Sequence, residues 1–316
     1  MTVFVLNTNV ISGHEKMFLA FYELYQGDKT LLNLKEEGVL SAFKLLAAKN
    51  RLIISAGYPA QNLFLILFYR IFFKKINIYT PFGFHMKYFR VNSANLKEFV
   101  YKLIVFGRRI SFTTCSEEQK AYLIERFPSR SVFSLNNFIQ AANPPQFSKP
   151  NGNRVFFIGR VDQTQKNCLF FEPLSRLIKN EINLVGECVD KDLEVRLKNS
   201  NIHLLGKQPN PYQLLSTNDC IVLPSFYEGA ALVVIEACYQ NIPIILSDCV
   251  GNRSITSNAI FFNTPEDASE LLASCFNSDK FFIEKWNYFR ESVKNNYCRD
   301  QFVKQLNAFE YYYNAI

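Results

Sequence analysis

The sequence lacks the features that mark metal centres, secreted disulfide proteins and membrane spans. Its eight cysteines include no C-x-x-C pair, and no group of cysteines and histidines has the spacing of a zinc site. Several cysteines lie in apolar runs, which favours reduced thiols in the core of a cytoplasmic protein. The longest apolar run, Leu63 to Tyr69, is stopped by Arg70 and is too short to cross a bilayer. The first residues do not resemble a signal peptide.

Glycine and proline are also scarce, with 12 of each among 316 residues, so long disordered segments are not expected. There is a single tryptophan, although aromatic residues make up 15% of the chain. Apolar residues account for 48%, which is enough to build a sizeable core in one or two domains.

Acidic residues are depleted in the first half of the chain. Residues 1–145 hold 18 Lys and Arg against 9 Asp and Glu, whereas the remainder holds 17 against 19. Between residues 70 and 109, nine basic residues accompany one acid, Glu98. No nucleic-acid-binding motif accompanies this charge, so a nucleic-acid partner is not expected.

The same basic region has an amphipathic pattern. Apolar residues recur at helical spacing between positions 96 and 106, with lysines and arginines beside them. This pattern is typical of a helix at a membrane surface, and we expect residues 64–109 to contact an anionic membrane from the cytoplasmic side. The alternative is a helix whose apolar face packs on the core and whose basic face is solvated.

Apolar runs of strand length alternate with helical patterns, which predicts parallel, doubly wound α/β sheets. A stretch rich in proline, 142–152, divides the alternation into two series. We therefore expect domains at 1–145 and 146–298, with a last helix in 299–316 that crosses back to the first domain. One large open sheet is the alternative. Expected strands are Val3–Leu6, Leu52–Ala56, Ile76–Tyr79, Ser111–Thr114, Ser131–Leu135, Arg154–Ile158, Ile182–Val185, Ile202–Leu205, Cys220–Leu223, Ile244–Leu246 and Ala259–Phe262. Expected helices are Glu15–Gln26, Ala60–Phe73, Leu96–Phe106, Glu117–Phe127, Leu169–Lys179, Lys191–Asn199, Tyr212–Ser216, Ala230–Tyr239, Glu266–Phe276, Lys280–Asn295 and Asp300–Tyr313.

The most informative segment is 225–237, which places two glutamates eight positions apart around a strand-to-helix turn. The start of a helix favours an anion such as phosphate. Glu228 lies at that turn, where it repels phosphate but accepts hydrogen bonds from hydroxyl groups beside it. Glu236 lies roughly 11–12 Å further along the helix and needs donors, which a ribose diol supplies. The pattern favours a nucleotide-sugar; the alternative is one surface glutamate and one capping glutamate.

With Pro224-Ser225 and Asn241-Ile242-Pro243-Ile244-Ile245, this segment closely resembles the donor site of retaining glycosyltransferases of family 4. The resemblance is strong over about 154–262 and loose over 1–150. It implies the GT-B fold, in which two Rossmann-like domains face a cleft. It also implies that the helix start at Gly229, Ala230 and Ala231 binds the donor.

A Gly-Arg pair followed by a lysine also resembles this family, here Gly159, Arg160 and Lys166. The resemblance implies that both cations hold the donor diphosphate and stabilise the leaving group, so no metal or other cofactor is expected. Gly186 resembles a glycine near the nucleotide base, and His85 a histidine near the reacting carbon.

Two further segments are compared with the family. Gly13, in a segment that resembles the family's Gly-Gly-x-Glu loop, is expected beside the donor, and the neighbouring His14 is expected to be exposed. His203 is expected to be a satisfied sheet residue. The chain departs from the family after Gly251, where Asn252 and Arg253 replace a glycine pair that a glutamate follows.

The expected function is transfer of a sugar from a nucleoside diphosphate to a glycan or lipid-linked acceptor, in bacterial surface polysaccharide or lipopolysaccharide synthesis. Glu228, His85, Arg160 and Lys166 are the expected catalytic residues. One alternative is a phosphorylase or sugar-phosphate synthase of the same fold. The other is a non-catalytic partner subunit that has kept the fold.

Overall fold

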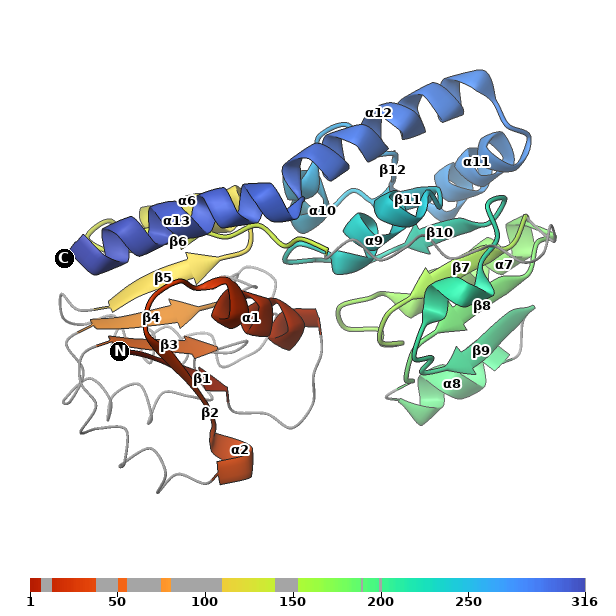
Figure 1. Cartoon of the computed structure of the whole chain (residues 1–316). Coiled ribbons are helices and arrows are strands. Elements are labelled where there is room, and N and C mark those ends of the chain that lie inside the picture. Colours follow the sequence, from red (N-terminus) through yellow and green to blue (C-terminus); the bar gives the residue numbers. More distant parts are fainter. Residues whose placement is uncertain are drawn as a thin grey trace. The chain divides into compact units, whose positions relative to one another are not determined.

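The computed structural model divides the chain into two compact units, Met1–Phe138 with Arg299–Ile316, and Ile139–Cys298 (Figure 1). It describes residues 1–6, 13–37, 51–55, 75–80, 110–139, 153–188, 190–198 and 201–315. The predicted linker at 142–152 lies outside the described residues. So do the predicted helices Ala60–Phe73 and Leu96–Phe106. Of the basic region 64–109, the structure describes only residues 75–80.

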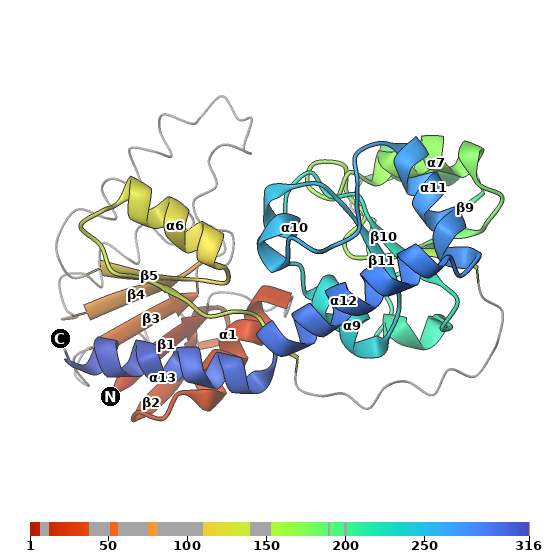
Figure 2. The same cartoon turned by 90° about the horizontal axis from the view of Figure 1, so that it is seen from above.

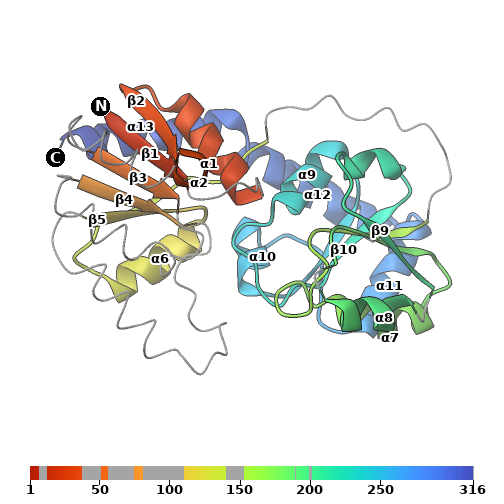
Figure 3. The ribbon, with the colours of Figure 1, turned by 90° about the horizontal axis from the view of Figure 1, so that it is seen from below.

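The first unit is built on a six-stranded sheet in the order β2-β1-β3-β4-β5-β6, with every neighbouring pair parallel. The order of the first five strands can be followed in Figure 3. The strands β1, β3, β4 and β5 are almost wholly buried, as expected of a parallel sheet that is covered on both faces, whereas the edge strand β2 has one buried residue, Leu32. The strands are β1 (Thr2–Leu6), β2 (Lys29–Asn33), β3 (Arg51–Ser55), β4 (Lys75–Tyr79), β5 (Ile110–Thr114) and β6 (Val132–Ser134).

The helices of this unit lie on both faces of its sheet. Figure 2 shows α6 (Glu117–Arg126) and α13 (Arg299–Ala315) on opposite sides of the strands. The crossovers through α1 (Gly13–Leu24), from β1 to β2, and through α6, from β5 to β6, run in opposite directions along the sheet, so right-handed connections place these two helices on opposite faces. Helix α13 packs with α1, where Phe309 contacts Phe21. The remaining described helix is the short α2 (Leu34–Glu37).

The last helix completes the first unit. The Tyr313 hydroxyl of α13 donates a hydrogen bond to the carbonyl of Leu52 in β3 (3.2 Å). A second link joins Gln305 Oε1 to the amide of Asn136 (2.8 Å), beyond β6. On α1, the ring of Phe21 packs edge-on against Phe309 at 5.4 Å between ring centroids. These contacts join residues more than 160 positions apart into one core.

The second unit has its own six-stranded parallel sheet, in the order β12-β11-β10-β7-β8-β9. Two separate sheets exclude a single large sheet and confirm the predicted pair of doubly wound α/β units. Helices α7 and α11 pack together, and α9 packs with α12. The strands are β7 (Val155–Ile158), β8 (Ile182–Val185), β9 (Ile202–Gly206), β10 (Cys220–Leu223), β11 (Ile244–Ser247) and β12 (Phe261–Phe262). The helices are η3 (Cys168–Phe170), α7 (Phe171–Leu177), α8 (Lys191–Lys198), η4 (Pro211–Leu214), α9 (Leu232–Gln240), α10 (Val250–Ile255), α11 (Pro265–Phe276) and α12 (Lys280–Asn296).

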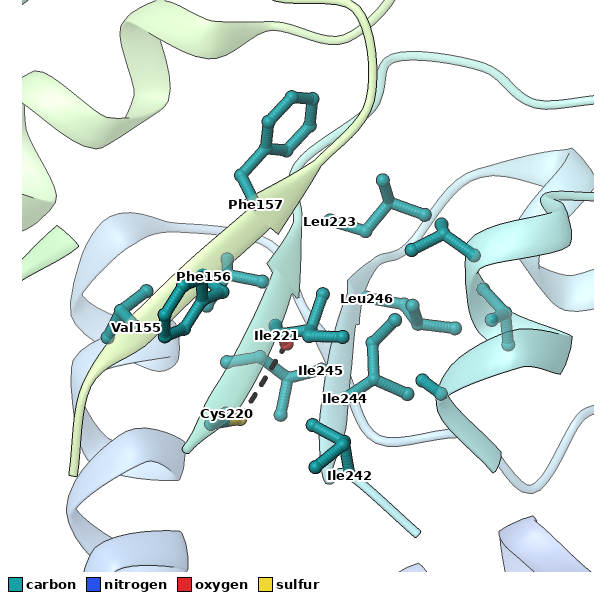
Figure 4. Close-up of a cluster of buried hydrophobic side chains, with 14 of the residues drawn as sticks. Val155, Phe156, Phe157, Cys220, Ile221, Leu223, Ile242, Ile244, Ile245 and Leu246 are labelled. Atoms are coloured by element: carbon teal, nitrogen blue, oxygen red, sulfur yellow. Dashed lines mark hydrogen bonds between the residues drawn. The ribbon is translucent and has the colours of Figure 1, made fainter. Parts of the chain in front are cut away.

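The core of the second unit is formed largely by its central strands. Figure 4 shows buried side chains of β7, β10 and β11, among them Phe156, Ile221 and Ile244, which are paired across the three strands. Each of these three residues is fully buried. A rigid centre of this kind fixes the carboxyl ends of β7 and β10, from which the candidate site emerges.

The observed elements differ from the predicted ones in a few places. β2 was not predicted, because only two of its five residues, Leu31 and Leu32, are apolar. The six-residue α10 was also missed, because its sequence contains glycine and β-branched residues that are weak helix formers. The expected helix at Tyr212–Ser216 is a single 3₁₀ turn, η4. Helix α9 begins at Leu232 rather than Ala230.

Two strand ends approach so closely that only glycine fits. A Cβ atom on Gly186, after β8, would lie 1.7 Å from the carbonyl oxygen of Gly159, after β7. By contrast, Gly206 has open space around it and a left-handed φ of +66°.

Replacing Gly186 with alanine is therefore expected to destabilise the protein by about 2–4 kcal/mol, because a backbone carbonyl must move. The matched control, Gly206→Ala, adds only the cost of a left-handed alanine, about 1 kcal/mol. Urea unfolding of both variants measures the difference. Equal losses would contradict the close approach.

Candidate functional site

The loop after β7 is organised around the carboxylate of Asp162. This side chain is 5% exposed and accepts hydrogen bonds from the amides of Gln165 (2.7 Å) and Lys166 (3.3 Å) and from the Thr164 hydroxyl (3.1 Å). Arg160 Nε donates to its other oxygen at 2.8 Å. The loop therefore folds around one anion, which sets the direction of Arg160 and Lys166.

Asp162 is held in its ionised form. Burial by itself raises the pKa of this carboxyl, but the hydrogen bond from the Gln165 amide and the contact with Arg160 outweigh it, and the net pKa lies below the ordinary value. Asp162 is not among the site residues that the sequence predicted. Its position three residues before Gln165, in a loop that follows a strand, is typical of a carboxylate that caps nearby amides.

Lys166 and Glu228 are brought together from two loops. β7 and β10 are neighbours in the sheet, so their carboxyl ends place the loops 159–166 and 224–231 side by side. Lys166 Nζ lies 2.6 Å from Glu228 Oε1, and the side chains are 15% and 5% exposed. The Ser225 hydroxyl donates to the same carboxylate oxygen at 2.5 Å. Two of the predicted donor-site residues thus form a largely buried ion pair.

Glu236 lies in the second turn of α9 and is half-buried. The hydroxyl of Tyr212, from η4, donates to Glu236 Oε2 at 3.1 Å and also lies 3.3 Å from the carbonyl of Val233. Burial raises the pKa of Tyr212 well above its ordinary value, and the charge of Glu236 raises it further. Tyr212 is therefore a neutral donor that orients this carboxylate.

The start of α9 is the part of the loop that suits an anion. Gly229, Ala230 and Ala231 are buried, and Ala231 occupies the N-cap position, where it provides no side-chain hydrogen bond. Helices α6, α11 and α12 begin differently, because Ser116, Thr264 and Asp279 cap them. A phosphate at α9 would provide the oxygens that an N-cap side chain provides elsewhere.

The loop after β11 packs against the backbone of the Glu228 loop. A Cβ atom on Gly251 would lie 2.0 Å from the Glu228 carbonyl oxygen, so the two backbones touch. The Ser247 hydroxyl donates to the carbonyl of Ser225 at 2.5 Å. Asn252, which is fully buried, donates to the carbonyl of Ser247 at 2.9 Å. Asn252 is therefore a structural residue of this loop.

The structure describes only some of the predicted site residues of the first unit. Gly13 begins α1, but the preceding loop and His85 lie outside the described residues. The prediction of an exposed His14 was wrong: its Nε2 lies 2.8 Å from Ser55 Oγ, and its ring stacks on Tyr79 at 5.4 Å. Burial lowers the pKa of His14 to about 4, although the charge of Glu15 acts in the opposite direction. The imidazole is therefore neutral at physiological pH.

The remaining candidates concern the second unit and the whole chain. His203 lies in β9, as expected, but is exposed because β9 is an edge strand. Gly186 and Gly159 form the close approach described above. Within the described ranges, no group of three or more His, Cys, Asp or Glu residues could hold a metal ion. Nor does any helix in that part of the chain have the length and apolar character needed to cross a membrane.

The lowered pKa of Asp162 predicts a pH dependence. Because the pKa is lower in the folded than in the unfolded chain, the stabilisation is complete above about pH 4 and is lost as the pH falls through the folded value. Asp162→Asn is expected to cost about 2 kcal/mol at pH 7. The difference from the wild type should shrink below pH 4 in urea unfolding series. A constant difference down to pH 2 would contradict the assignment.

Part of the second unit is similar to known glycosyltransferases. Residues 152–277 match the model of the family described as glycosyl transferases group 1. An uncharacterized glycosyltransferase of Methanocaldococcus jannaschii is 40% identical over 140 residues, which cover 40% of this chain and 34% of that protein. The poly(ribitol-phosphate) alpha-N-acetylglucosaminyltransferase of Staphylococcus aureus is 24% identical over 61% of this chain and 42% of its own length. The chain thus spans about a third to two fifths of these relatives.

Solved structures extend the likeness to the whole chain. The lipopolysaccharide outer core galactosyltransferase WaaB matches with a TM-score of 0.66 at 14% identity, over 100% of this chain and 99% of its own. A sucrose-phosphate synthase from Thermosynechococcus elongatus matches with a TM-score of 0.75 at 15% identity, over 99% of each chain. At these identities the likeness shows the fold, which is GT-B. Residues 152–277 are therefore a glycosyl transferases group 1 domain within a chain of the GT-B fold.

Proposed function

We propose that this protein is a glycosyltransferase that moves a sugar from a nucleoside diphosphate to a glycan or lipid-linked acceptor. The observation that carries the proposal is the Lys166–Glu228 pair beside the start of α9, which no side chain caps, within the segment that matches the family model. A cation, a helix start and a carboxylate in one place suit a ligand that joins a diphosphate to a hydroxyl-rich sugar.

In this proposal the two cations serve the diphosphate. The bond from the sugar to the diphosphate breaks during transfer, and negative charge grows on the leaving oxygen. Lys166 and Arg160 stabilise that charge, together with the amides at the start of α9. This arrangement supplies the charge that a metal ion supplies in other phosphate chemistry, so we propose that the reaction requires no metal and no other cofactor.

The two glutamates serve the sugars. Glu228 accepts hydrogen bonds from the hydroxyls of the transferred sugar, and Glu236, oriented by Tyr212, accepts them from the ribose. His85 is proposed to contact the donor sugar near the reacting carbon. We propose retention of configuration at that carbon, which the family resemblance implies. Analysis of the product linkage by NMR tests this directly, since an inverted anomer would refute it.

For the acceptor, the relatives' names give the chemical class. They include a capsular polysaccharide biosynthesis glycosyltransferase of Staphylococcus aureus and a Campylobacter jejuni enzyme named for an undecaprenol-linked diphosphate glycan. We propose that this protein acts in bacterial surface polysaccharide or lipopolysaccharide synthesis, at the cytoplasmic face of the membrane, through the basic region 64–109.

The alternatives differ in what they require. A phosphorylase or sugar-phosphate synthase would consume phosphate or a phosphosugar; the likeness to sucrose-phosphate synthase concerns only the fold and does not favour this reading. A non-catalytic subunit would release no nucleotide at all. Release of nucleoside diphosphate that depends on a glycan or lipid-linked acceptor separates transfer from both.

The donor site predicts metal-independent nucleotide binding. In a thermal-shift screen of UDP, GDP, ADP and CMP, one nucleoside diphosphate at 100 times its dissociation constant should stabilise the protein by about 2.7 kcal/mol. The shift should persist in EDTA and should be lost in Lys166→Gln. Loss of the shift in EDTA would refute metal independence, and no shift with any nucleotide would refute the donor site.

The role of Glu236 predicts an effect that depends on ribose. Tyr212→Phe removes the hydroxyl that donates to Glu236 and should weaken nucleoside diphosphate binding about fivefold, or about 1 kcal/mol. Binding of inorganic pyrophosphate, which has no ribose, should not change. The matched control is Tyr239→Phe. It removes a hydroxyl from α9, the helix of Glu236, and this hydroxyl donates to the Lys294 carbonyl. Calorimetry that found equal losses for both ligands would contradict the ribose contact.

A further inference from the structure

The cation proposed to bind the diphosphate already has a partner in the ligand-free chain. Lys166 Nζ lies 2.6 Å from Glu228 Oε1, with the side chains 15% and 5% exposed. Both charges have lost most of their water, so each stabilises the other. Removing one partner from a pair of this kind leaves an uncompensated charge in a poorly solvated place, which is costly. The diphosphate must therefore compete with Glu228 for Lys166.

The two members of the pair are not equally free to move. Glu228 is fixed by the Ser225 hydroxyl at 2.5 Å, and its backbone is in contact with Gly251. Ser225 in turn is held at its carbonyl by Ser247. Lysine, in contrast, carries its charge at the end of a flexible four-carbon stem. An exchange of partners therefore moves Lys166 and leaves Glu228 in place.

The second cation of the site differs in one important way. If Arg160 leaves Asp162 for a ligand, that carboxylate keeps the amides of Gln165 and Lys166 and the Thr164 hydroxyl as donors. If Lys166 leaves Glu228, the Glu228 carboxylate keeps, among the contacts of the described residues, the single hydrogen bond from the Ser225 hydroxyl. The energetic consequence of cation exchange therefore falls on Glu228 and not on Asp162.

We propose that Glu228 is a specificity-determining residue that distinguishes the intact donor from the spent nucleoside diphosphate. The inference rests on the proposed function. An intact donor takes Lys166 with its diphosphate and compensates Glu228 with the hydroxyls of its sugar. A nucleoside diphosphate without the sugar takes Lys166 but leaves Glu228 buried and short of donors. The site therefore binds the donor more tightly than the spent nucleotide.

The same exchange helps product release. After the sugar has moved to the acceptor, no hydroxyl remains to compensate Glu228, and Lys166 returns to it. The returning lysine removes one cation from the diphosphate, which lowers the affinity for the product. The ion pair of the resting state and the discrimination between donor and product are thus two consequences of one contact.

The test is a comparison of two affinities in one variant. Glu228→Gln keeps the size of the side chain but removes the charge that competes for Lys166. Its affinity for the nucleoside diphosphate should rise about tenfold, because binding no longer breaks an ion pair. Its affinity for the matching nucleotide-sugar should not rise with it. Isothermal titration with UDP, GDP and ADP and with one sugar conjugate of each gives both values.

The matched control is Glu172→Gln, in the same unit. Glu172 pairs with Arg176 and Arg196 at 2.8 and 3.0 Å, outside the site. This variant should show the wild-type ratio of donor to product affinity. If Glu228→Gln does not fold, Glu228→Asp withdraws the carboxylate from Lys166 by one methylene group, and product affinity should rise by a smaller factor.

The outcomes separate the inference from the function on which it rests. Unchanged or weaker binding of the nucleoside diphosphate by the Glu228 variant, with a wild type that binds it, overturns the inference and leaves the donor site intact. A wild-type protein that binds none of the nucleotides overturns the proposed function, and the inference with it.

Discussion

The ion pair between Lys166 and Glu228 is the contact on which the site depends, because it joins the loops that follow two neighbouring central strands. Each loop is fixed independently, one around the buried carboxylate of Asp162 and the other against Gly251 and Ser225. The pair is therefore preorganised: the protein places a cation and an anion at the carboxyl edge of the sheet before any ligand arrives.

The parallel sheet makes this arrangement possible, because in such a sheet all loops that leave the carboxyl ends of the strands emerge along one edge. Close backbone contacts then fix their spacing. Gly186 touches the Gly159 carbonyl and Gly251 touches the Glu228 carbonyl, so neither contact tolerates a side chain. The buried side chains of β7, β10 and β11 keep these strand ends in register. The geometry of the site therefore depends on the positions of the strands, since a shift of a single strand would separate Lys166 from Glu228.

The sequence predicted the fold well where burial is complete. Strands Ile182–Val185 and Cys220–Leu223 were predicted with their observed bounds, because continuous apolar runs between turns leave little choice. Elements with weak local signals, β2 and α10, were not predicted. Of the site, Arg160, Lys166, Glu228 and Glu236 came from local motifs. Asp162 and Asn252 were missed although their partners lie within five residues along the chain. Tyr212 and Ser247 were missed because their partners, Glu236 and Ser225, come from other elements. His14 was misjudged for the same reason: its partners, Ser55 and Tyr79, come from other strands.

The proposed function depends most directly on the binding of a nucleoside diphosphate between the β7 loop and the start of α9. Amide hydrogen exchange, with and without a saturating nucleoside diphosphate, tests it at the level of single segments. We expect slower exchange in residues 159–166 and 225–236, and unchanged exchange in α12, at Lys280–Asn296. Protection confined to other segments, or no protection at a concentration that stabilises the protein, would contradict it.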